Sequence, residues 1–461
     1  MLRRSFVRSM AAGPACGLVR FPCGWAAQQR GGMPPAGPFQ PSEGLNHPLG
    51  EGKGIYPGRV VWVRDAKAAT WDGKTGFWWD DASTDPRAVG RMTSRVLLDL
   101  TGRKNEKQAW DALFRHFNET HGRGGSGYRR GEKIVIKINA NQDRGPDWSY
   151  MVRGGMAARA GSGPPRPPQN GLPSPHAVVA LVKSLTGAGG VRGGDIIVYD
   201  VTAGRNIGQP IYTRFKGDAG PGLREVSFLV GDSHGHSGRL SPTPDLTNPV
   251  RFSKAGIPAA FLPREVTGAQ YMINMALLRP HGMAGLTLIG KNHFGSLYFP
   301  EDGGWSPRIL HGHVLRTQAM GSYNSLVDLM GHRHLGGKTM LYVLDGLYTA
   351  AHNEGNVYRW QSFGDQWAAS LLMSQDPVAL DSVGLDILRS EPRATEVRGN
   401  ADNYLHEAAE AARPPSGTIY DPDRSGALAS LGTHEHWNHA GEKKYSRNLG
   451  GKQGIELIAR L

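Results

Sequence analysis

Residues 271–295 contain a dense group of side chains that can transfer protons or bind anions. His281 stands in a Pro-His-Gly turn, and Lys291, Asn292 and His293 follow it closely. An imidazole titrates near neutral pH and suits general acid–base work, whereas an ammonium can hold a phosphate or carboxylate. The structural alternative is a loop histidine bound to the backbone and a lysine that stabilises a helix end. We interpret His281, Lys291 and His293 as candidate catalytic residues, with Asn292 as a candidate for binding an anion or cofactor.

A strand, a turn and a helix are predicted to position this group. Residues 271–276 are apolar and β-prone, and Pro280 and Gly282 interrupt regular structure. Residues 283–294 then carry helix-compatible apolar residues. Open α/β sheets place their ligands in such a crevice, between the carboxyl end of a strand and the following helix. The sequence therefore predicts a ligand site at that edge of a sheet.

Three further predicted strands end in polar residues that could share this edge. The strands span residues 132–138, 195–200 and 339–344, and the polar residues are Lys137, Asn139, Asp200 and Asp345. Lys137 and Asn139 are candidates for binding an anion or cofactor. Carboxylates at strand ends can bind a hard cation or orient a histidine, so Asp200, Asp345 and His293 are the candidate metal ligands. Capping of turns and helices is the alternative role for the carboxylates.

A helix start and a polar turn supply more anion-binding candidates. Ser174 is a good N-cap and Pro175 suits the first helical position, so a helix should begin there. The amides of such a start can hold an anion, with His176 beside them. Arg205 lies in the polar turn that follows the strand ending at Asp200. Since any helix start can offer its amides, a plain cap is the alternative.

The order of these elements favours an α/β fold. Strand–helix–strand successions argue for a largely parallel sheet with helices on both faces. The 64 glycines and 31 prolines predict a loop-rich protein, with irregular N- and C-terminal extensions. The other expected helices span residues 85–101, 104–121, 174–185, 323–330 and 376–388, and residues 215–263 are expected to be irregular and β-rich.

The first residues resemble a twin-arginine export signal. Arg3-Arg4-Ser5-Phe6-Val7-Arg8 has two arginines before a Phe, an apolar residue and a base, although Leu2 takes the usual Ser/Thr place. A disordered basic N-terminus or an organelle presequence is the alternative. The twin-arginine machinery would make the protein periplasmic or extracellular, and the sequence contains no apolar run long enough to span a membrane. We expect a signal peptide over 1–27, a Gly/Pro-rich linker over 28–54, an α/β domain over 55–399 and a C-terminal extension over 400–461.

Charge and cysteine content narrow the chemistry. A formal net charge of +13 suits anionic ligands or simply a solvated basic surface, and we do not expect nucleic acid because charge is its sole support. Cys16 and Cys23 are the only cysteines and both lie in the leader region. No iron–sulfur cluster, zinc–thiolate site or cysteine nucleophile is therefore expected. The cofactor is not determined, and a divalent metal would need His, carboxylate or amide ligands.

Three histidine pairs and an aromatic loop each have two interpretations. The pairs are His311-x-His313, His332-x-His334 and His434-x-His436. On a strand, each pair would share a face and could hold a metal, whereas in loops the rings are often only solvated. The loop holds Trp71, Trp78 and Trp79, which could stack on sugar or cover the core.

The order of these motifs resembles the domain-of-unknown-function family 362, over about residues 131–388. The landmarks are Lys137-Ile138-Asn139, Ser174-Pro175-His176, Asp200, Ile273-Asn274, His281-Gly282, Lys291-Asn292-His293-Phe294-Gly295, Asp345-Gly346 and the segment from Asp376 to Asp381. The motifs at 402–407 and 434–437 resemble those of exported members with a twin-arginine signal. The family has no general assigned activity. Some members carry ferredoxin-like cysteine motifs, which this chain does not have.

The layout is also similar, more distantly, to the lactate racemase family, which uses a nickel-pincer nucleotide. That resemblance implies Lys291 and His293 as candidates for cofactor attachment and metal binding, with His281 in acid–base work. The spacing of the motifs differs from that family.

These observations support two hypotheses of different classes. The first is an exported enzyme that acts on a small anionic molecule by acid–base chemistry. Whether it also uses a metal or nucleotide cofactor is left open. The alternative is a non-catalytic protein that binds anionic glycans or surfaces through the basic face and the loop from Trp71 to Trp79.

Overall fold

The structure is a computed structural model that describes residues 43–140, 171–204, 207–218, 220, 222–231, 238–353 and 355–461. All of these belong to one unit of the chain, Pro41–Leu461. The expected signal peptide, most of the linker, Arg205 and the histidines at 234 and 236 lie outside the described residues.

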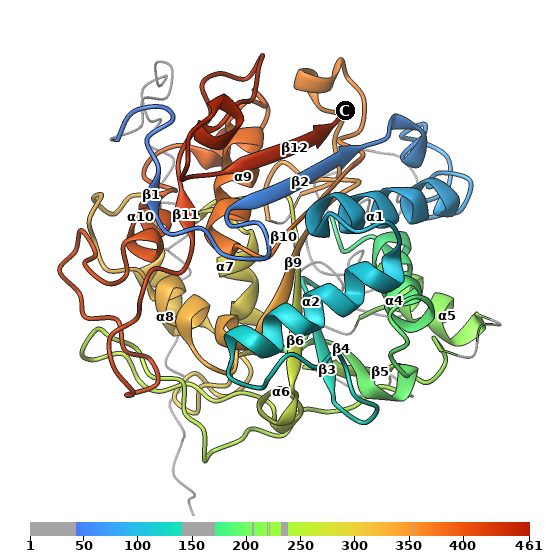
Figure 1. Cartoon of the computed structure of the whole chain (residues 1–461). Helices are drawn as coiled ribbons and strands as arrows, with labels where there is room; N and C mark the ends of the chain where they lie inside the picture. The colour runs from blue at the N-terminus through green and yellow to red at the C-terminus, as the bar shows by residue number, and fades with distance from the viewer. Residues whose placement is uncertain are drawn as a thin grey trace, which may run out of the picture. The chain divides into compact units, whose positions relative to one another are not determined.

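Within these ranges, eight strands form a central, largely parallel sheet, as predicted (Figure 1). β10 is antiparallel to both of its neighbours, β2 and β9, and every other neighbouring pair is parallel. In spatial order the strands are β12 (Glu456–Arg460), β2 (Arg59–Arg64), β10 (Ser370–Ser374), β9 (Thr339–Gly346), β6 (Tyr271–Leu277), β3 (Ile134–Ile138), β4 (Ile196–Asp200) and β5 (Ser227–Val230).

The sheet is buried on both faces. β3 and β6 are buried along their whole length, which explains why they read as continuous apolar runs. In β2 the side chains alternate, so that Val60 and Trp62 enter one hydrophobic core while Val61 enters the other. A three-layer α/β architecture follows from this pattern.

Helices cover both faces, as predicted. One core includes side chains of α1 (Pro86–Thr101), α2 (Glu106–Thr120), α4 (Pro175–Gly187) and α5 (Gln209–Gly217). The other includes side chains of α6 (Arg264–Gly268), α7 (Ile289–Asn292), α8 (Ser325–Gly331), α9 (Pro377–Arg389) and α10 (Asn403–Ala409). None of the helices in the described ranges combines the length and apolar character that a membrane crossing requires.

Helix starts follow the capping residues that the sequence offers. The side chains of Asp85, Ser174 and Asp376 accept backbone N–H groups at the starts of α1, α4 and α9, and a proline follows each of them.

Short elements complete the described chain. The short strands are β1 (Leu49–Gly50), paired with β11 (Thr433–His434), and β7 (Pro280–His281), paired with β8 (Gly285–Leu286). The 3₁₀ helices are η1 (Ala66–Ala68), η3 (Gly193–Asp195), η4 (His293–Ser296), η5 (Arg308–His313), η6 (Gly336–Lys338), η7 (Gln361–Phe363), η8 (Thr395–Val397) and η9 (Ser446–Leu449).

The predicted helix over residues 283–294 is wrong in its first half. Its start instead forms the β7–β8 hairpin, and Gly285 adopts φ +83° there, which disfavours other residues. Helical structure begins only at Ile289, because the carboxylate of Asp381 accepts the N–H groups of Ile289 and Gly290. A tertiary contact therefore sets the helix start, and local sequence does not reveal it.

Two other segments are more regular than expected. The helix α5, which was not predicted, lies mostly before the stretch over 215–263 that was expected to be irregular and extends into it as far as Gly217. The C-terminal extension supplies β12, which pairs with β2 at one edge of the central sheet. The extension is thus part of the main fold.

We predict that Asp381→Ala lowers the free energy of unfolding by about 2–4 kcal/mol. The buried carboxylate accepts the N–H groups of Ile289 and Gly290 at 2.8 and 3.0 Å and the hydroxyl of Tyr404 at 2.8 Å, and the variant leaves all three without an acceptor. Urea unfolding measures the change. Asp111→Ala, which breaks an exposed pair, is the control and should cost under about 1 kcal/mol. Equal losses in both variants would contradict this role.

Candidate active site

Four neighbouring parallel strands bring polar residues to one edge of the sheet. β9, β6, β3 and β4 are adjacent and run in the same direction, so their carboxyl ends meet. The residues at or just after these ends include Asp345, Arg279, His281, Asn139 and Asp200. The predicted edge therefore exists, and its side chains are almost all buried.

Lys137 is held in a buried ion pair. Its Nζ lies 3.3 Å from Oδ2 of Asp200 and 3.2 Å from Oδ1 of Asn292. Burial lowers the pKa of Lys137, and the Asp200 carboxylate partly offsets that shift. A Cβ on Gly295 would lie 2.6 Å from this Nζ, which explains the glycine that ends the Lys-Asn-x-Phe-Gly motif. Lys137 therefore links β3 to β4 and to the end of α7.

Two asparagines connect Lys137 to His293 through hydrogen bonds. Asn292 donates from Nδ2 to Oδ1 of Asn274 at 2.7 Å, and Asn274 Nδ2 lies 3.1 Å from Nε2 of His293. Burial, and then the positive charge of Lys137, lower the pKa of His293 to about 3. His293 is thus a neutral ring in a polar network that fixes α7 against β6.

Lys291 differs from Lys137 in having no acidic partner. Its side chain is buried, and its Nζ lies 3.5 Å from the centre of the Phe294 ring. Within the described part of the chain, no carboxylate pairs with it. Burial lowers the pKa of Lys291 to about 7, so at neutral pH a substantial fraction of this amine is uncharged.

Two neutral imidazoles accompany Lys291. The rings of His281 and His311 have centres 6.3 Å apart, and the His311 ring stands edge-on to Phe294 at 5.5 Å. Burial and then the charge of Lys291 lower the pKa of His281 well below its usual value, and the same causes lower that of His311 to about 4. The three side chains form an unusual group of one amine and two uncharged rings.

Hydrogen bonds to the ring show which nitrogen of the neutral His281 carries the proton. Its Nδ1 accepts the backbone N–H groups of Met283 and Ala284 at 3.1 and 3.3 Å. The neutral ring must therefore carry its proton on Nε2, where it can donate a hydrogen bond. This geometry suits a hydrogen-bond donor or acid better than the general base suggested by sequence.

Arg279 and Asn139 line the same edge. The Arg279 guanidinium donates to the carbonyl oxygen of Gly171 at 2.7 Å and to Oδ1 of Asn139 at 3.4 Å. Asn139 Nδ2 donates to Thr287 at 3.3 Å. Arg279 also helps to lower the pKa of His281, after burial, Lys291 and His311.

The other predicted residues, Ser174, Asp345 and His176, make contacts of their own. Ser174 caps α4 and its N–H donates to Asp345 Oδ2 at 2.7 Å, while burial raises the pKa of Asp345 to about 6. His176 lies 2.8 Å from Asp81, which also binds Arg214, beside a separate hollow of about 1080 Å³.

The three predicted metal ligands each have their own contacts. Asp200 pairs with Lys137, Asp345 accepts backbone N–H groups, and His293 contacts Asn274. Across the described residues, the group of His, Asp and Glu side chains with ligand atoms within 4.8 Å is instead Glu43, His434 and His436.

Sequence reasoning missed part of the Lys291 group. His311 was expected, with His313, either to bind a metal on a strand or to be solvated in a loop; it lies instead in the 3₁₀ helix η5, and His313 contacts Tyr323. Arg279 was not among the predicted site residues. Its place directly before Pro280 and His281 is the signal that could have found it.

Comparisons with known proteins agree with the family resemblance. Residues 237–386 match the family described as Domain of unknown function (DUF362). This part of the chain, which holds β6, α7 and the Lys291 group, matches that family model, as the motifs predicted. No curated protein matches the chain.

A solved structure is also similar to part of the chain. It is the lactate racemase apoprotein from Thermoanaerobacterium thermosaccharolyticum, with 12% sequence identity and a TM-score of 0.29. The match covers 58% of this chain and 51% of the racemase, so it spans about half of that protein. Likeness at this level carries no argument about activity.

We predict that burial of Lys291 makes stability rise with pH. Unfolded lysine titrates near about 10.4, so between about pH 7 and pH 10 the unfolded chain binds more protons than the folded chain. The stability of the wild type relative to Lys291→Met should therefore increase by up to about 1.4 kcal/mol per pH unit above pH 7. Urea unfolding at pH 6–9 measures it, with exposed Lys452→Met as control. A difference that is constant with pH would contradict the prediction.

Proposed function

We propose that this protein is an enzyme that moves a proton on a small anionic substrate at the edge formed by Lys291, His281 and His311. One observation carries the proposal: a buried amine without an acidic partner among the described residues lies against Phe294, whose ring also contacts His311, and His311 lies beside His281. Burying a lysine in this way costs free energy, and such groups concentrate at functional sites.

The substrate class follows from charge and pKa. The unpaired Lys291 and the nearby Arg279 favour an anion such as a carboxylate. An amine with a pKa of about 7 is uncharged often enough at neutral pH to act as a base. We therefore expect the Lys291 amine to take a proton from a carbon acid, a substrate whose C–H bond lies next to a carbonyl or carboxylate group.

Each side chain has a stated part in the step. The neutral Nζ of Lys291 takes the proton from carbon, and the electron pair of the broken C–H bond moves onto the neighbouring carbonyl oxygen. The Nε2–H of His281 donates to the oxygen on which negative charge develops, and the low dielectric of the site strengthens that bond. The ammonium of Lys291 then returns a proton to carbon.

A second role for Lys291 that is consistent with the proposal is covalent attachment of a cofactor. An uncharged amine is a nucleophile and can form a covalent link to a carbonyl-bearing group. Intact and peptide mass spectrometry of protein purified from its native source would reveal such an adduct and map it.

We also propose that the twin-arginine leader exports the protein to the periplasm or cell exterior.

Binding of anionic glycans is the second candidate function. The loop from Trp71 to Trp79 no longer supports a surface sugar platform, because Trp71, Trp78 and Trp79 are buried. The hollow beside His176 is the better place for such a ligand, since stacked Phe77 and Trp79 line it together with Lys183 and Arg214.

We predict exchange of carbon-bound hydrogen in deuterated water. A panel of 2-hydroxy, 2-amino and 2-oxo carboxylates is incubated with the protein, and proton NMR follows loss of the C2 or C3 hydrogen. Lys291→Met should lower the exchange rate of an active compound by about 10²–10⁴-fold, and His281→Gln by about 10²-fold. The wild-type rate should rise with pH through about 7, as the amine loses its proton.

The control variant is Lys183→Met, beside the separate hollow, which should exchange at the wild-type rate. Loss of exchange in that variant, with Lys291→Met unaffected, would overturn the proposed site.

A further inference from the structure

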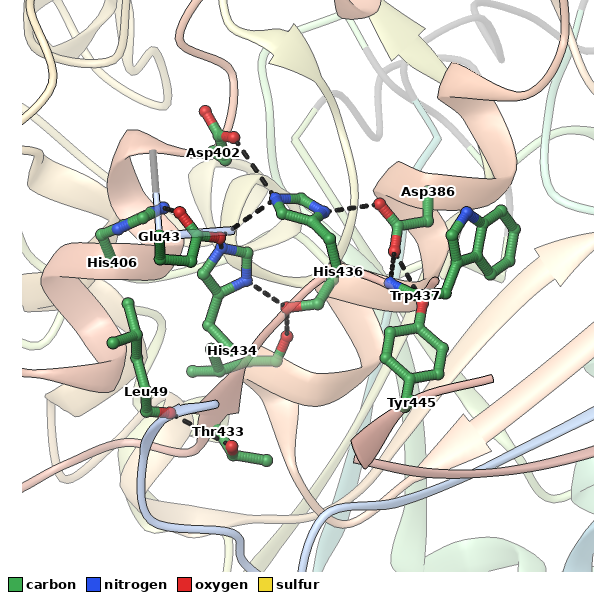
Figure 2. Close-up of polar contacts among 12 residues, drawn as sticks. Glu43, Leu49, Asp386, Asp402, His406, Thr433, His434, His436, Trp437 and Tyr445 are labelled. Atoms are coloured by element: carbon green, nitrogen blue, oxygen red, sulfur yellow. Dashed lines mark hydrogen bonds and ion pairs between the residues drawn. The ribbon is translucent and has the colours of Figure 1, made fainter. Parts of the chain in front are cut away.

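A second group of buried ionisable side chains lies in the part of the fold built from the two ends of the described chain. We call it the carboxylate–histidine cluster, and its members are Glu43, His406, His434 and His436. Glu43 precedes β1, His406 lies on α10, and the other two lie on and just after β11. Figure 2 shows the three rings turned toward the Glu43 carboxylate.

Glu43, His434 and His436 have ligand atoms that all lie within 4.8 Å of one another, close enough to hold one metal ion, whereas His406 contacts the second oxygen of the Glu43 carboxylate. The Nε2 atoms of His434 and His436 lie 3.4 and 3.5 Å from Oε1 of Glu43, and Nε2 of His406 lies 3.3 Å from Oε2. Charge-assisted hydrogen bonds between nitrogen and oxygen are shorter, at about 2.7–2.9 Å. A tetrahedral zinc ion, with bonds of about 2.0–2.1 Å, separates neighbouring ligand atoms by about 3.3–3.4 Å.

Two of the rings are held with their Nε2 lone pairs toward the centre. Nδ1 of His436 lies 2.6 Å from Oδ1 of Asp386, which can only accept, so this nitrogen carries the proton. Nδ1 of His434 lies 2.8 Å from the hydroxyl of Ser382, which already donates its own proton to the carbonyl oxygen of Val378. His434 must donate here too. Such orienting hydrogen bonds on the outer nitrogen accompany metal-bound histidines.

The inner nitrogen of His434 is buried and has only a long contact to Glu43. Its Nε2 atom is enclosed and lies 3.4 Å from the Glu43 carboxylate, which is long for a charge-assisted hydrogen bond. A metal ion at this position would satisfy the nitrogen more fully. The exposed fraction is 0% for His434 and 1% for His436, so the cluster has no open side for a substrate.

We propose that Glu43, His434 and His436 hold a divalent transition metal such as Zn²⁺ through one oxygen and two nitrogens, with His406 against the second oxygen of the Glu43 carboxylate. Histidine and carboxylate side chains are common zinc ligands, and the enclosure of both rings favours a structural role. The metal would join the segment before β1 to the β11 region, which Ser382 and Asp386 connect to α9.

The site would also support the residues around Lys291. α9 carries Ser382 and Asp386, which orient the cluster, next to Asp381, which binds the start of α7. Tyr404, on α10 beside His406, donates to the same Asp381. Metal binding would thus stabilise the frame that holds α7, whatever reaction that edge performs.

Metal content of the full chain is the test. Protein produced with Zn²⁺ in the medium is dialysed and analysed by inductively coupled plasma mass spectrometry. We expect one equivalent of metal in the wild type and in the control His439→Ala, which removes an exposed histidine. His434→Ala and Glu43→Gln should each lose most of it.

A milder variant covers the case in which His434→Ala fails to fold. Ser382→Ala removes only the acceptor of the His434 proton and should weaken Zn²⁺ affinity by about 10–100-fold in a competition titration with a chelator. Replacement of the metal by Co²⁺ should give the visible absorption of a tetrahedral site in the wild type. The proposal is overturned if folded wild type binds no Zn²⁺ in this titration, or if Ser382→Ala and Glu43→Gln bind it as tightly as His439→Ala.

Discussion

Burial of charged groups at the carboxyl ends of the strands is the constraint on which this structure depends. Two lysines lie there, and they are treated differently. Lys137 is paired with Asp200 and tied to Asn292, so its charge is compensated. Lys291 is buried against Phe294 without such compensation, and its pKa is lowered to about 7. The ion pair of Lys137 connects neighbouring elements at this edge of the sheet. The amine of Lys291 has no such pair within the described residues and can therefore take part in proton transfer.

Helix α9 connects this edge to the rest of the molecule. Two consecutive residues of α9 contact two different regions. Asp381 accepts the N–H groups that start α7, and Ser382 contacts His434 in the carboxylate–histidine cluster. The N- and C-terminal parts of the described chain meet beside the same helix through the β1–β11 pair. The position of Lys291 therefore depends on segments distant in sequence, which are not peripheral additions to the domain.

Local sequence predicted the layers of the fold because the strands are continuous apolar runs and the helices carry clear caps. It predicted that His281 follows the carboxyl end of β6 and precedes a helix with Lys291, because an apolar strand, a Pro-His-Gly turn and a basic segment are visible in the chain. It did not predict that α7 begins only at Ile289, since the distant Asp381 sets that boundary. Nor could it show that His311 joins His281, or that Glu43 reaches the histidines at 406, 434 and 436, because such contacts arise only from tertiary packing.

The most direct measurement of the central claim is the titration of the Lys291 amine itself. Protein carrying ¹³C- and ¹⁵N-labelled lysine is followed by NMR from pH 5 to pH 10, with Lys291→Met used to assign the signal. The account predicts that the Lys291 resonances shift with a midpoint near 7. A midpoint near the ordinary value of about 10.4 would show that the amine is solvated or paired, and would contradict the proposed role of Lys291 as a base.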